Sequence, residues 1–147
     1  MTSEDTFSDV IAFIRDTGSK LNNDPAETRA LRVIQGKANR LQYLDNHPQR
    51  RFCWFFLNVF LEDVFYNLSG DIPYVSNVDN ARIEFLKALG SNLMKFSESL
   101  NDQNFHGCFA TFEEMVGSYL DTINGINSLT HEYNNGSKRE ANNRVAF

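Results

Sequence analysis

Cysteine and tryptophan are scarce in this chain of 147 residues. The small number of cysteines argues against two classes of protein. There are only two, Cys53 and Cys108, and neither is part of a CxxC pair. Two thiols this far apart argue against a disulfide framework and against a cysteine-based metal site. We expect both to be buried free thiols inside helices.

Histidine-based metal and haem motifs are missing as well. None of the three histidines, His47, His106 and His131, follows a carboxylate by three residues, as a di-iron bundle requires. HExxH and CxxCH are also absent. The sequence therefore predicts no metal ion and no cofactor.

Signals for a membrane or the secretory route are lacking too. Residues 1–9 are acidic and polar, without the basic and apolar regions of a signal peptide. The net charge of −5 argues against general attraction to nucleic acid or to a membrane. We expect a cytoplasmic protein with no membrane contact.

Phenylalanine, in contrast, is abundant: 13 residues, many of them in the segment FCWFFLNVFLEDVF at 52–65. The segment is too short for a membrane span and its apolar side chains point in nearly every direction, which predicts the central helix of the fold. The aromatic rings fill the core in one interpretation. In another they line an apolar ligand site or offer an aromatic groove to a partner helix.

Apolar residues elsewhere recur with the helical period, and no segment alternates as a strand does. Asp24-Pro25-Ala26-Glu27 is typical of a helix start, Pro48 marks a boundary, and the polar run 134–137 predicts an end. The predicted fold is all-α, an antiparallel bundle of about five helices: one N-terminal helix and two hairpins, 25–68 and 79–125. Residues 1–137 form a single domain and residues 138–147 a polar tail.

The two hairpins resemble each other when the chain is shifted by 55 residues. The shift superposes Cys53 on Cys108, Leu31 on Leu86 and Gly70 on Gly125. A duplication explains the agreement, and so does chance agreement between two amphipathic hairpins of equal length. Both explanations stay open.

Basic residues gather between positions 28 and 51, where the local net charge is +5 and the rest of the chain carries −10. This cluster predicts contact with an acidic protein surface, or else an ordinary solvated face. The apolar stretch at 72–75, within the irregular segment 71–78, is a second candidate contact. The predicted partner-binding residues are Arg29, Arg32, Lys37, Arg40, Arg50, Arg51, Ile72, Tyr74 and Val75.

Arg40 is followed by six residues and then His47. This spacing resembles the Arg-x(4–6)-His motif of the HEPN family of small helical nucleases, although Leu41 stands where that family usually has a polar residue. The resemblance implies that the guanidinium holds an RNA phosphate while the imidazole transfers a proton.

Together these features favour a non-enzymatic, regulatory protein-binding module, such as an adaptor, assembly factor or inhibitor, whose partner is another protein. A HEPN-like RNA-binding or RNA-cleaving domain that uses Arg40 and His47 is the first alternative. An apolar small-molecule sensor is the second. A homodimer is compatible with each of them.

Overall fold

A computed structural model of the protein describes the backbone of residues 6–24, 29–68 and 76–144, and the side chains of residues 6–24, 29–68 and 80–128. Five helices make up these ranges: α1 (Phe7–Asn23), α2 (Arg29–Leu44), α3 (Pro48–Leu68), α4 (Ser76–Asn101) and α5 (Phe105–Arg144). The described backbone contains no strand, so the all-α prediction is confirmed.

The helix ends follow local chemistry. The side chain of Thr6 accepts a hydrogen bond from the backbone N–H of Asp9 at 3.3 Å and caps α1. Pro48 is the first residue of α3, where its missing N–H costs nothing. Asn104 accepts from the N–H of Gly107 at 3.0 Å and so stabilises the start of α5. Of the predicted start at Asp24–Glu27, residues 25–27 lie outside the described residues.

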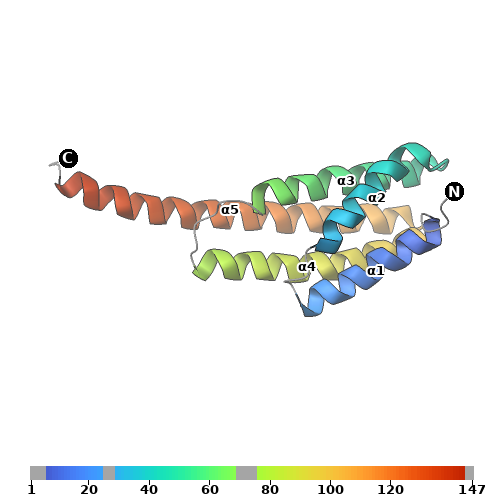
Figure 1. The fold of residues 1–147 in the computed structure, drawn as a ribbon, viewed down its shortest axis with the longest axis horizontal. Helices are drawn as coiled ribbons and strands as arrows, with labels where there is room; N and C mark the ends of the chain where they lie inside the picture. Colours follow the sequence, from blue (N-terminus) through green and yellow to red (C-terminus); the bar gives the residue numbers. More distant parts are fainter. Residues whose placement is uncertain (1–5, 25–28, 69–75, 145–147) are drawn as a thin grey trace.

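The helices pack as an antiparallel bundle (Figure 1), in which the two predicted hairpins are present. Three residues, 45–47, join α2 to α3, and another three, 102–104, join α4 to α5. The N-terminal helix α1 packs along α4 in the opposite direction, where Gly18 and Gly90 let the two backbones approach closely. The helices α3 and α5 run parallel, because the ring pairs Phe52–Phe109 and Phe60–Tyr119 advance together along both.

One hydrophobic core joins all five helices. Its largest fully buried side chains include Ile14 of α1, Ile34 of α2, Trp54 of α3, Phe96 of α4 and Met115 of α5. Each helix therefore contributes one apolar stripe to the same interior, as expected for a bundle.

The helix α3, however, is not the central helix that its composition predicts. Residues such as Trp54, Leu57 and Leu61 are buried, but Phe52, Phe55 and Val59 are about half exposed, at 52%, 50% and 48%. The reason is topological: α4 packs against both α1 and α5, whereas α3 has a close neighbour only in α2 and a smaller contact with α5. One apolar face of α3 is left uncovered by the described residues.

The helix α5 also differs from its prediction. The run 134–137 does not end it, and the backbone stays helical to Arg144. Asn and Gly cost only about 0.5–1 kcal/mol each inside a helix, so a short run of them does not have to end one. Figure 1 shows this final part of α5 projecting beyond the ends of α3 and α4. None of the helices, over the residues described, is long and apolar enough to cross a membrane.

Candidate functional site

The turn between α2 and α3 is organised by Asp45. Its carboxylate accepts two hydrogen bonds from Arg50 in a bidentate pair, with Nε and Nη2 each 2.9 Å from a carboxylate oxygen. The indole N–H of Trp54 donates to it at 2.9 Å, and so does the backbone N–H of His47 at 3.0 Å. Burial alone would raise the pKa of Asp45, but these hydrogen bonds outweigh burial and lower it.

The predicted basic residues are divided among different neighbours. Arg32 stacks over the ring of Phe65 on α3, with 4.3 Å from the guanidinium carbon to the ring centroid. Lys37 lies over Phe13 of α1 on another side of α2, at 5.9 Å. Contacts within the chain therefore engage both cations, and the structure does not bring them together on one outer face.

The remaining basic candidates are spread in the same way. Arg50 pairs with Asp45, and its guanidinium carbon lies 4.4 Å from the ring centroid of Phe7. Arg51 is exposed and donates from Nε to the backbone carbonyl of Gln42 at 3.1 Å. Arg29 and Arg40 are exposed on α2. The other candidates, Ile72, Tyr74 and Val75, lie outside the described residues.

His47 is partly buried in the α2–α3 turn. Its ring packs against Phe105 with 5.2 Å between centroids, and its Nδ1 atom is buried without a hydrogen-bond partner. The proton-transfer role that the HEPN resemblance implies for this imidazole is not tested by this geometry.

The parallel helices α3 and α5 border an open apolar groove of about 870 Å³. The ring centroids of Phe56 and Phe112 stack 3.9 Å apart at its base, and Phe52 meets Phe109 edge to face at 5.7 Å. Both Phe52 and Phe109 are exposed. The full lining is Pro48, Gln49, Phe52, Phe56, Phe109, Phe112, Glu113, Val116 and Gly117.

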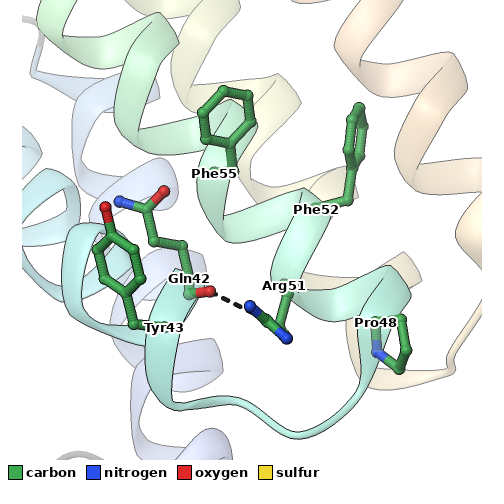
Figure 2. A pocket seen from close by; sticks show the side chains of 6 residues that line it. All are labelled: Gln42, Tyr43, Pro48, Arg51, Phe52 and Phe55. Atoms are coloured by element: carbon green, nitrogen blue, oxygen red, sulfur yellow. Dashed lines mark hydrogen bonds between the residues drawn. The ribbon is translucent and has the colours of Figure 1, made fainter.

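The exposed apolar surface extends past this groove on both helices. Phe55, Val59 and Tyr66 follow Phe52 along α3 at helical spacing, and Leu120 follows Phe109 one turn beyond Val116 on α5. Figure 2 shows Phe52 and Phe55 projecting outward from α3, while Arg51 of the same helix points toward the backbone carbonyl of Gln42. We call this set the α3–α5 face; its exposed apolar members are Phe52, Phe55, Val59, Tyr66, Phe109 and Leu120.

Cys53 of α3 and Cys108 of α5 are fully buried and free. The prediction that both thiols are buried is confirmed. The neighbouring Cys108 thiol raises the pKa of Cys53, and burial raises it further, so this thiol stays protonated.

Tyr119 joins α5 to the C-terminal half of α3. Its hydroxyl donates to the carboxylate of Asp63 at 2.7 Å and accepts from the side-chain amide of Asn67, also at 2.7 Å. Burial is the largest influence on this phenol, and together with Asp63 it raises the pKa of Tyr119 to about 12. These hydrogen bonds therefore hold α3 and α5 together at this end of the α3–α5 face.

The described side chains contain no group of three or more His, Cys, Asp or Glu residues that could bind a metal ion. Comparison with known proteins gives no match to a protein-family model, to a curated protein or to a solved structure.

The predicted partner-binding residues, which are basic residues and 72–75, include no apolar member of the α3–α5 face, and the sequence offered an aromatic groove only as an alternative. The signal was available in α3, whose apolar residues cover more of the helix surface than one stripe requires. What the sequence could not supply is that α5 runs alongside and adds Phe109 and Leu120 to the same surface.

Proposed function

We propose that this protein is a non-enzymatic protein-binding module and that its partner binds to the α3–α5 face. The observation that supports this most is the row of half-exposed aromatic rings along an apolar groove. Contiguous exposed apolar surface is rare unless it mediates contact, and aromatic side chains are enriched where proteins meet. The groove has the form that receives an apolar helix face.

The sequence predicts that the basic residues bind the partner, but in the structure they give this proposal less support. Arg32, Lys37 and Arg50 contact aromatic rings or a carboxylate within the chain. Arg51, at the edge of the α3–α5 face, is the basic residue placed to meet an acidic group on a partner. A regulatory role and a cytoplasmic location remain predictions.

A photocrosslinking experiment tests the proposal. Phe55 is replaced by benzoylphenylalanine in the full chain, and a matched variant carries the same group at Val33 of α2, where the exposed fraction is similar, 47% against 50%. Irradiation in the cells that make this protein should yield a protein adduct from position 55. Position 33 should give none, and adding Phe52→Glu to the position-55 variant should abolish the adduct.

Equal adducts from positions 55 and 33, or none from position 55, would refute the proposal. An adduct with a small apolar molecule instead of a protein would favour the sensor alternative. Circular dichroism checks that Phe52→Glu stays folded, which we expect because this side chain is about half exposed.

A further inference from the structure

The exposed side of α3 carries opposite charges at its two ends. Arg51 is exposed beside Phe52 and Phe55 (Figure 2). Eleven residues further along, Glu62 is exposed next to Val59 and Tyr66, and Asp63 is exposed beside it. At 1.5 Å per residue, the cation and the first carboxylate are about 17 Å apart along the helix, with apolar side chains between them.

When a second copy of α3 is turned end to end, its cation faces the carboxylates of the first copy and its carboxylates face the cation of the first. We propose that the partner of the α3–α5 face is a second copy of this chain, with α3 of one protomer antiparallel to α3 of its partner. A two-fold axis near Leu57 brings Arg51 opposite Asp63 and Glu62, and Phe55 opposite Val59. This inference rests on the proposed function, since it names the partner that the face receives.

The charges favour this arrangement over the other pairing of two copies. A parallel pairing would place Arg51 against Arg51 and Glu62 against Glu62, and like charges across an interface are unfavourable. The antiparallel pairing makes each attraction twice, because a two-fold interface uses the same patch on both protomers. One helix thus supplies both halves of the charge match, which a partner of unrelated sequence would have to supply separately.

Contacts within the chain leave Arg51 and Glu62 able to form new ion pairs, whereas the carboxylate of Asp63 already accepts hydrogen bonds from Tyr119 and Asn67. Arg51 uses one of the five N–H donors of its guanidinium for the carbonyl of Gln42. Glu62 meets the amide of Gln35 at 3.5 Å through one of its two oxygens. Both hydrogen bonds are made to neutral groups of α2, so neither neutralises the charge of Arg51 or Glu62.

Charge reversal on the full chain tests the inference, with mass read by light scattering and native mass spectrometry. The wild type should be a dimer of two 16.9 kDa chains. Arg51→Glu alone and Glu62→Lys alone should each weaken the dimer by roughly tenfold to a hundredfold, because each reversal acts at two symmetric contacts. An equimolar mixture of the two variants should form a heterodimer, and the double variant should form a homodimer.

Matched reversals away from the face serve as controls. Arg15→Glu on α1 and Glu98→Lys on α4 replace exposed side chains of the same types and should leave the wild-type mass unchanged. A wild type that stays monomeric at high micromolar concentration overturns the inference. A dimer indifferent to Arg51→Glu and Glu62→Lys also overturns it, and so does a mixture of the two that fails to pair.

The crosslinking experiment separates this inference from the proposed function. If position 55 yields an adduct with a different protein while the wild type is monomeric, the second copy is excluded and the protein-binding function stands. If position 55 yields no adduct and the wild type is monomeric, both are wrong. An adduct of twice the chain mass supports both.

Discussion

The crossing of α1 and α4 allows a sharp test of the fold, because two glycines meet there. A methyl group added at Gly90 would lie 2.6 Å from the carbonyl oxygen of Gly18 and 2.7 Å from the backbone nitrogen of Asn22. One added at Gly18 would lie 2.6 Å from the carbonyl oxygen of Gly90. Because these neighbours are backbone atoms, no side chain can turn away to make room, and α1 itself must shift.

Two opposed effects decide whether Gly90→Ala raises or lowers the free energy of unfolding. Alanine in place of glycine inside a helix stabilises by about 0.5–1 kcal/mol. Overpacking that forces a backbone shift costs about 1–3 kcal/mol or more. The shift here would also strain the hydrogen bond from Asn22 Nδ2 to the carbonyl of Lys87, 3.0 Å long. We therefore expect Gly90→Ala to lower the free energy of unfolding by about 1–2 kcal/mol.

Two other glycines provide the control. An added methyl at Gly36 of α2 or at Gly125 of α5 meets nothing within 4 Å. Alanine there should raise the free energy of unfolding by about 0.5–1 kcal/mol. Urea titration at pH 7 measures all three variants, and a shift of about 2–4 °C in Tm per kcal/mol gives a second readout. If Gly90→Ala were as stable as Gly36→Ala, the close approach of α1 to α4 would be refuted.

Three further predictions concern buried polar groups. Tyr119→Phe should lower stability at pH 7 by about 1 kcal/mol, and it should remove a pH dependence of the wild type. The raised pKa, about 12 when folded, means that this stability is complete below pH ~10 and is lost as the pH rises towards 12; a wild-type curve with no such decline contradicts the assignment. Asp45→Ala should cost about 2–4 kcal/mol, because it leaves the Trp54 indole N–H buried without its acceptor. Since the pKa of Asp45 is lowered on folding, its contribution should be present above pH ~4 and be lost as the pH falls through the folded value; unfolding in acid that is identical in Asp45→Ala argues against this. Cys53 and Cys108 should react slowly with a thiol reagent until denaturant is added, since both are fully buried, and rapid labelling of the native protein would show that they are accessible.

The sequence predicted the local features of the fold well. The boundary at Pro48, for example, depends on a single residue that cannot continue a helix. The core stripes are also local, since they follow from the helical period. The extension of α5 to Arg144 was missed because unfavourable residues in a helix carry only small individual costs.

The candidate site depends instead on which helix packs beside which. The contact of Cys53 with Cys108 and that of Phe52 with Phe109 arise because α3 and α5 run side by side. The distribution of the basic residues has the same origin: Lys37 lies over Phe13 only because α1 docks against α2. The period of apolar residues identifies the buried stripe of each helix but not the identity of its neighbour.

This distinction between a buried stripe and the neighbour that covers it matters most for α3, which has more apolar residues than one buried stripe needs. An all-round apolar helix indicates that every side is to be covered, and the sequence alone assigns that cover to the rest of the chain. In the structure, α2 covers one side and α5 covers part of another. Phe55 and Val59 stay about half exposed, and Tyr66 is mostly exposed. Exposed aromatic rings at helical spacing, with a cation at one end and carboxylates at the other, are what an interface helix requires. The composition that predicts a central helix therefore also agrees with the proposal that a second molecule completes the cover of α3.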